Sequence, residues 1–173
     1  FDFDKFVETC KESRIINNLR NHSTKSRLIT FNEYKEMNPR DLIKKILNQQ
    51  NYSLAAEISN YLDYSDKDVY ECYAISNIKR LPMNSSVVQQ EKLYNDLIAK
   101  FQGVQNISYS KIAKKAFKFE KYDIGLKFLD NEKSILTKIP QYILLKKWDK
   151  ALELSLDTFD NNVLNAVLDK IFK

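Results

Sequence analysis

Residues 121–130, KYDIGLKFLD, contain Gly125, one of only two glycines in this chain of 173 residues. The apolar spacing around Gly125 is helical, although glycine inside a helix costs about 1 kcal/mol relative to alanine. Two other stretches, NYSLAAEI (51–58) and KWDKALEL (147–154), follow the same pattern. Each has an aromatic residue, a small residue three positions later and an apolar residue six positions later: Tyr52, Ala55 and Ile58; Tyr122, Gly125 and Phe128; Trp148, Ala151 and Leu154.

Each motif follows an apolar, helix-like segment, so the pattern predicts a helix, a very short turn and a second helix. The small residue then lies where the two helices meet, and we expect Tyr52, Ala55, Gly125 and Ala151 to serve hairpin packing. On this interpretation Gly125→Leu overpacks the hairpin, whereas Gly125→Ala is nearly neutral. The alternative is a glycine merely tolerated near a helix end.

Composition favours the same fold class. Two glycines and three prolines are too few for the turns of a β-sandwich or the loops of a doubly wound sheet, and no run alternates like a half-buried strand. We therefore predict an all-α fold, an α-solenoid of stacked antiparallel helical hairpins. The expected domains are an N-terminal helix and polar linker (1–26) and a helical-repeat domain (27–173) that is a fragment of a longer chain.

Local signals place several helix starts. Residues 3–20 are expected to be helical, with Phe3, Phe6, Val7 and Cys10 on one face. Thr30 and Glu33 have capping-box spacing, and Asn38 followed by Pro39 is a strong N-terminal signal. Pro140 is expected to open another helix at PQYILLKKW.

The sequence carries little catalytic equipment, so we predict no catalytic residue, no cofactor, no metal site and no enzyme activity. His22, the single histidine, lies in a polar stretch, and Cys10 and Cys72 form no metal-binding or redox pattern. The acidic run 63–68 lacks the glycine and terminal glutamate of a calcium loop. No apolar run reaches the roughly 18 residues of a membrane span.

One charge pattern remains in a chain of net charge +5. Lysine pairs at 44–45, 114–115 and 146–147 fall near the turns of the three hairpins. They are either solvated helix ends, which favour cations, or a basic edge for an acidic partner. The residues expected to bind a partner are Lys114, Lys115, Phe119, Lys121, Tyr122, Lys146, Lys147 and Trp148, although Trp148 suits a buried anchor equally well.

Four segments carry a family resemblance: ISYSKIAKKA (107–116), IPQYILLKKWDKAL (139–152), DTFDNNVL (157–164) and NYSLAAEISNYL (51–62). In order and spacing they resemble the C-terminal helical region of the class C vacuolar protein sorting subunit sixteen. The resemblance covers about residues 40–172 and is most specific in 107–117 and 139–152. Relatives often have extra glycines where this chain has KFEKY (118–122), and residues 1–35 show nothing typical of the family.

The resemblance implies a non-catalytic scaffold of the HOPS and CORVET tethering complexes. Its helical repeats would dock an SM-family subunit that governs SNARE assembly, supporting membrane fusion and protein transport to the vacuole or lysosome. The implied location is peripheral, on the cytoplasmic side of late endosome and vacuole membranes, with other tethering subunits as partners, SNAREs as indirect partners, and no nucleic acid. The alternative that stays open is a helical-repeat RNA-binding module, whose binding would weaken steeply with salt.

Overall fold

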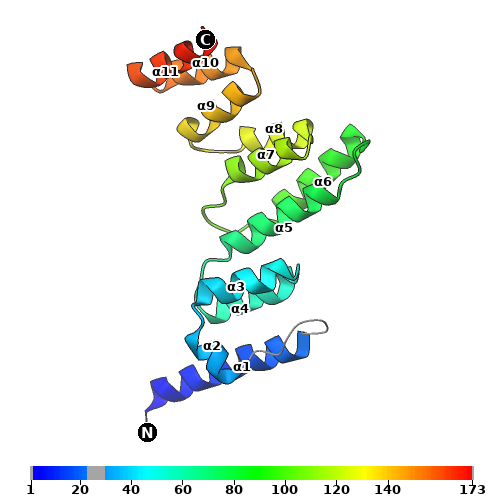
Figure 1. Cartoon of the computed structure of the whole chain (residues 1–173), viewed down its shortest axis with the longest axis vertical. Coiled ribbons are helices and arrows are strands. Elements are labelled where there is room, and N and C mark those ends of the chain that lie inside the picture. Colours follow the sequence, from blue (N-terminus) through cyan, green and yellow to red (C-terminus); the bar gives the residue numbers. More distant parts are fainter. Residues whose placement is uncertain (1, 23–29, 173) are drawn as a thin grey trace. The chain divides into compact units, whose positions relative to one another are not determined.

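Figure 1 shows a computed structural model that describes residues 2–22 and 30–172. The described residues form eleven α-helices and no strand, so the all-α prediction is confirmed. The helices are α1 (Phe3–His22), α2 (Phe31–Glu36), α3 (Pro39–Asn48), α4 (Tyr52–Tyr61), α5 (Lys67–Arg80), α6 (Val87–Lys100), α7 (Tyr109–Lys118), α8 (Tyr122–Asp130), α9 (Ile135–Leu144), α10 (Trp148–Asp157) and α11 (Asn161–Ile171).

The chain divides into two compact units, Phe1–Tyr73 and Ala74–Lys173, with the division inside α5. Most of the predicted polar linker, residues 23–26, lies outside the described residues. The expected domain boundary after residue 26 therefore stays a prediction.

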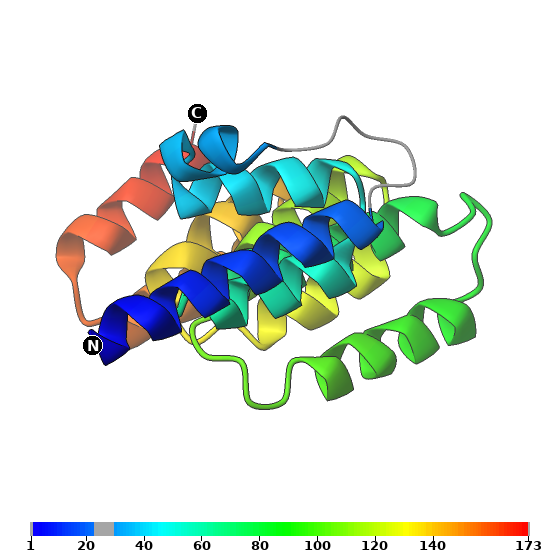
Figure 2. The same cartoon turned by 90° about the horizontal axis from the view of Figure 1, so that it is seen from below.

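Unit 1 is organised around the hairpin of α3 and α4, which lie side by side in both views (Figures 1 and 2). The predicted start signals are confirmed: Asn38 caps α3 with Pro39 at its first position, and Thr30 and Glu33 form a capping box on α2. α1 contacts α4, where the Asn18 amide donates to Glu57 Oε1 at 2.7 Å. The buried core comprises Ile15, Leu19, Leu42, Ile43, Ile46, Leu54, Ala55, Ile58 and Val69.

The apolar face expected at the beginning of α1 is not part of this core. Phe3 and Phe6 are 68% and 52% exposed, and the buried face of α1 begins at Ile15. The spacing identified a helix correctly, but the burying contacts lie nearer its C-terminal end.

Unit 2 stacks two hairpins, α7–α8 and α9–α10, as the solenoid prediction requires, with α7 contacting α9 and α11 packing on α10. α6 lies against α8 through polar contacts. The Gln90 side chain accepts from the backbone N–H of Ile124 at 3.3 Å, and Lys127 pairs with Glu91 at 2.6 Å. Phe128 is fully buried between the rings of Tyr94, Phe101 and Tyr109.

α9 corrects the prediction that Pro140 opens a helix, because α9 begins at Ile135 and contains Pro140 in its interior. Proline lacks an N–H and therefore cannot bond the carbonyl four residues earlier, which here belongs to Leu136. Leu136 is 61% exposed and sits in the first turn, where its carbonyl can be reached by water. This placement makes an internal proline tolerable.

The three motif hairpins share one turn conformation. Gln50, Glu120 and Lys146 have φ of 60°, 60° and 56°, a left-handed conformation that normally favours glycine. In each turn the next backbone N–H donates to the carbonyl five residues earlier, at 3.4, 3.0 and 3.0 Å. The predicted helix–turn–helix units are thus confirmed, with a non-glycine residue at the same strained position in all three.

Candidate functional site

The small residues of the repeated motif are buried in the second helix of each hairpin. Ala55 and Ala151 are fully buried, and Gly125 is buried in α8. The aromatic partners differ: Tyr52 and Trp148 are half-buried, whereas Tyr122 is 51% exposed. Tyr52 makes an edge-on contact with Tyr73, their ring centroids being 5.4 Å apart.

Gly125 lies directly beneath the ring of Phe117 from α7. A Cβ placed on Gly125 would lie 2.7 Å from Phe117 Cδ1 and closer still to Cε1. The Phe117 ring also stacks on Tyr122 of the same helix α8, with centroids 6.2 Å apart and planes inclined by 22°. Even a methyl group at position 125 therefore requires the Phe117 ring to shift, so the structure argues against a nearly neutral Gly125→Ala and the effect stays a prediction.

The Phe117 ring also lines an open groove of about 390 Å³ that runs between the α7–α8 and α9–α10 hairpins. Tyr122 and Leu144 contribute further apolar surface, and Leu144 is 70% exposed. The complete lining is Lys114, Phe117, Lys118, Tyr122, Gln141, Leu144, Leu145 and Lys146. We call this set the lysine-rimmed groove.

The charged residues that line the groove are all positive. Lys114, Lys118 and Lys146 are exposed lysines on its rim, and no carboxylate is found among the described residues that line it. Lys115 and Lys147 are exposed on the same two elements without lining the groove. The structure thus brings three of the predicted partner-binding residues, Lys114, Tyr122 and Lys146, into one hollow.

The remaining predicted partner-binding residues are placed differently. Phe119 and Trp148 are half-buried and do not line the groove. Lys121 corrects the expectation of an exposed side chain: it is only 3% exposed, and its ammonium donates to the backbone carbonyl of Pro82. In the sequence Lys121 is a turn residue next to Tyr122, and nothing in that pattern indicates the buried contact with Pro82.

Two of the three lysine pairs are at equivalent repeat positions. Counted from the left-handed residue of each turn, Lys44 and Lys45, like Lys114 and Lys115, precede it by six and five positions, whereas Lys146 is itself that residue. The α9 positions that correspond to Lys114 and Lys115 are Pro140 and Gln141. The lysine register is therefore shared by two of the three hairpins, and in the third Lys146 lines the same groove as Lys114 from a different position. The basic edge stays a prediction.

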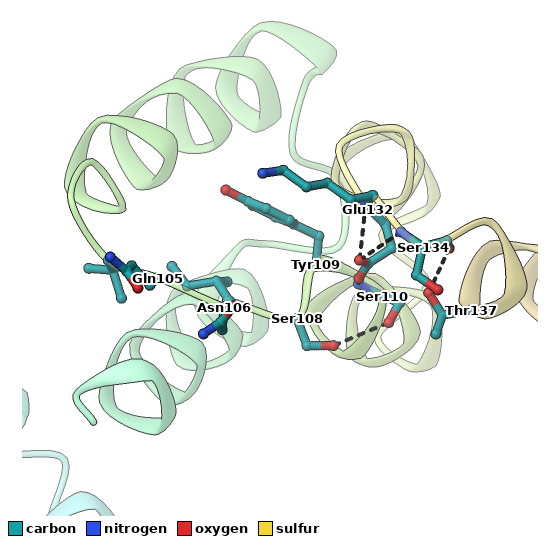
Figure 3. A pocket seen from close by; sticks show the side chains of 11 residues that line it. Gln105, Asn106, Ser108, Tyr109, Ser110, Glu132, Ser134 and Thr137 are labelled. Carbon is teal, nitrogen blue, oxygen red and sulfur yellow. Dashed lines mark hydrogen bonds between the residues drawn. The ribbon is translucent and has the colours of Figure 1, made fainter. Parts of the chain in front are cut away.

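A second hollow, of about 600 Å³, lies where the loop before α7 meets the loop between α8 and α9 (Figure 3). Glu132 is its central group, and sequence reasoning did not identify it. One carboxylate oxygen accepts from the N–H of Ser110 at 2.8 Å, and the other accepts from those of Lys133 and Ser134 at 3.0 and 3.4 Å. The one available signal was an acidic residue two positions before a helix N-cap.

The electrostatics of Glu132 follow from these contacts. Partial burial raises the pKa of its carboxyl, but the backbone hydrogen bonds from Ser110, Ser134 and Lys133 and the Ser110 side chain outweigh it, so the net pKa is lowered. The ionised carboxylate therefore joins the starts of α7 and α9, and this polar pocket serves to connect two hairpins.

The other chemical groups form no reactive cluster in the part of the chain that the structure describes. Within residues 2–22 and 30–172 there is no group of three or more His, Cys, Asp or Glu residues able to hold a metal ion. Among the described residues, Cys10 and Cys72 take part in no disulfide. The helices searched in the same ranges include none with the length and apolar character needed to cross a membrane.

Stacked helical hairpins with an apolar groove and a cationic rim define the class of this region as helical-repeat. Residues 107–173 match the family described as Vps16, C-terminal region. The predicted family resemblance is thereby confirmed, and the match falls on the unit that carries the groove.

Matches to individual proteins extend over nearly the whole chain. The chain is 23% identical to a vacuolar protein sorting-associated protein 16 homolog of Drosophila melanogaster over 167 residues, which is 95% of this chain and 19% of that protein. It is 25% identical to a probable homolog of the same name in Schizosaccharomyces pombe, over 99% of this chain and 20% of that protein. Protein VACUOLELESS1 of Arabidopsis thaliana is 24% identical over 100% of the chain and 20% of its own length. The chain thus spans about a fifth of the length of these curated relatives.

Proposed function

We propose that this chain is part of a non-catalytic scaffold subunit of a vacuolar tethering complex of the HOPS and CORVET type. In this role its helical repeats dock an SM-family subunit, and the complex supports membrane fusion and transport to the vacuole or lysosome. The observation that carries the proposal is the coincidence of the Vps16 C-terminal match, residues 107–173, with the unit that contains the lysine-rimmed groove.

The physical character of unit 2 supports a docking role. Leu145 and Lys146 from one hairpin turn, and Lys118 and Tyr122 on either side of another, line the same groove, so a partner can contact them without disturbing the buried helix faces. A stable protein interface buries about 1,600 Å² and is anchored by a small apolar centre. We expect residues 108–172 to be sufficient for docking, with other tethering subunits as further partners and SNAREs as indirect ones. The expected location is peripheral, on the cytoplasmic side of late endosome and vacuole membranes.

A binding titration of the whole chain against a purified SM-family subunit tests the proposal. We expect a complex at micromolar concentration that weakens only moderately as salt rises, because a packed protein interface depends little on counterion release. Absence of binding at that concentration contradicts the tethering role. A parallel titration with single-stranded RNA that gave tight, steeply salt-dependent binding would favour the RNA-binding alternative instead.

A further inference from the structure

We propose that the lysine-rimmed groove receives an acidic segment of a partner protein, which inserts apolar side chains against Phe117, Tyr122 and Leu144. We further infer that Gly125 sets the depth of the groove by fixing the position of Phe117. The inference rests on the proposed function, because it gives the docking unit a particular binding site and a particular kind of ligand segment.

Two of the large apolar side chains that line the groove are exposed to solvent. Leu144 is 70% exposed and Tyr122 is 51% exposed, and both line the groove. The groove volume of about 390 Å³ suits a few inserted side chains rather than a whole domain face. An amphipathic helix that lays its apolar stripe into such a groove is a common form of recognition.

The rim determines the charge of the inserted segment. Lys114 and Lys118 are one turn apart on α7, and Lys146 faces the same hollow from the turn after α9. No carboxylate among the described lining residues offsets these three charges. Complementary charge speeds encounter and suppresses wrong partners, so acidic side chains beside the apolar anchors fit this rim, and basic ones do not.

Gly125 affects the groove indirectly, because the Phe117 ring both packs on α8 at Gly125 and lines the groove. The ring occupies the volume that any Cβ at position 125 would need: such a Cβ would lie only 2.7 Å from Phe117 Cδ1. A side chain at position 125 would therefore move the ring away from α8, toward the groove and out of its stack on Tyr122. Gly125 is a positioning residue: it acts on the ligand only through Phe117.

The experiment compares Leu144→Ala with the matched control Leu136→Ala, which removes a similarly exposed leucine from the same helix, outside the groove. Each is titrated with the SM-family subunit and with a short labelled helical peptide that has leucines on one face and glutamates beside them. A second peptide carries lysines in place of the glutamates. We expect Leu144→Ala to weaken binding of the subunit and of the acidic peptide about tenfold, Leu136→Ala to leave both unchanged, and the lysine peptide not to bind. Thermal unfolding of each variant verifies that the fold is intact.

The outcomes separate this inference from the proposed function. If the SM-family subunit binds the natural chain and Leu144→Ala equally well, the groove assignment is overturned while the docking role stands. If the acidic peptide binds through Leu144 but the subunit does not bind, the docking partner is wrong and the groove stands. If the chain binds neither ligand, both fail. Gly125→Ala supplies the positioning test: we expect weaker peptide binding in the natural background but no further loss when the same change is made in a Phe117→Leu background. An equal loss in both backgrounds would refute the role of Gly125.

Discussion

The hairpins α7–α8 and α9–α10 have the same turn conformation but different residue sizes at corresponding positions of their two helices. Three positions before the left-handed residue, the first helix has Phe117 in one hairpin and Ile143 in the other. Five positions after it, the second helix has Gly125 in one and Ala151 in the other. The hairpin with the larger first-helix residue, Phe117, has the smaller second-helix residue, Gly125. In unit 1 the same positions hold Leu47 and Ala55. The comparison teaches that the small residue is matched to the size of its counterpart, because a packed interior conserves volume.

The largest effect is expected from Gly125→Leu. Its side chain enters space already filled by Phe117, so we expect a loss of about 1–3 kcal/mol in the free energy of unfolding. Chemical denaturation of the natural chain and the variant measures it. An unchanged denaturation midpoint would remove the basis for contrasting the two hairpins.

A second test addresses the turns that the two hairpins share. Reversing Lys114, Lys115, Lys146 and Lys147 to Glu should slow association with the SM-family subunit about tenfold at low salt, since exposed charges at the edge of an interface act mainly on the on-rate. Stopped-flow mixing measures the rate, and circular dichroism verifies the helical fold. Lys44→Glu/Lys45→Glu in unit 1 is the control, and an on-rate as fast as that of the control would assign the four lysines to solvated helix ends.

A double-mutant cycle tests the matching of sizes directly. Gly125→Ala alone should cost about 1 kcal/mol, whereas the same change in a Phe117→Leu background should be close to neutral, because that pair copies Leu47 and Ala55 of unit 1. Denaturation of all four proteins gives the coupling energy. Additive effects would show that residues 117 and 125 do not sense one another.

Smaller effects are expected at the shared turn conformation. Glu120→Gly and Lys146→Gly should each stabilise by about 0.5–1 kcal/mol, since glycine adopts their positive φ without strain. Equal gains at the two sites would confirm that the turns are energetically alike, and the melting temperature is the measurement. Lys115→Gly is the control, because residue 115 is an exposed position inside α7, and glycine within a helix should destabilise by about 1 kcal/mol.

The smallest effect concerns Glu132, which connects the starts of α7 and α9. Its folded-state pKa is lowered, so the ionised carboxylate stabilises the fold above its usual pKa of 4.5, and this contribution is lost as pH falls through the lower folded value. We expect Glu132→Gln to reduce the urea midpoint at neutral pH and to have less effect under acidic conditions. A difference between the two proteins that did not change with pH would indicate that the carboxylate charge is unimportant.

The hairpins could be predicted from sequence because their signals are local: capping residues, helical spacing and a repeated aromatic–small pair. The groove could not, since it depends on which side chains from different helices meet. In the sequence Phe117 merely has helical spacing from Ala113, and only the register of α7 against α8 places its ring over Gly125. Lys121 misled for the opposite reason: its partner, the Pro82 carbonyl, lies 39 residues away and leaves no pattern in the sequence.

The family match is narrower than the predicted resemblance. The resemblance was expected over about residues 40–172, whereas the matched region is residues 107–173 and contains the two segments expected to be most specific. The Glu132 contacts lie within that region but involve backbone N–H groups, which every residue except proline possesses. A sequence motif cannot mark such partners.

The left-handed turn residues have one more consequence. Gln50, Glu120 and Lys146 are neutral, negative and positive, yet their backbones are nearly superposable in φ. Because the backbone already accepts any of these side chains, one codon change at such a position alters the charge of the edge while leaving the hairpin intact. Partner choice in a helical array of this kind can therefore diverge between lineages through its turns, without selection having to rebuild the buried faces of its helices.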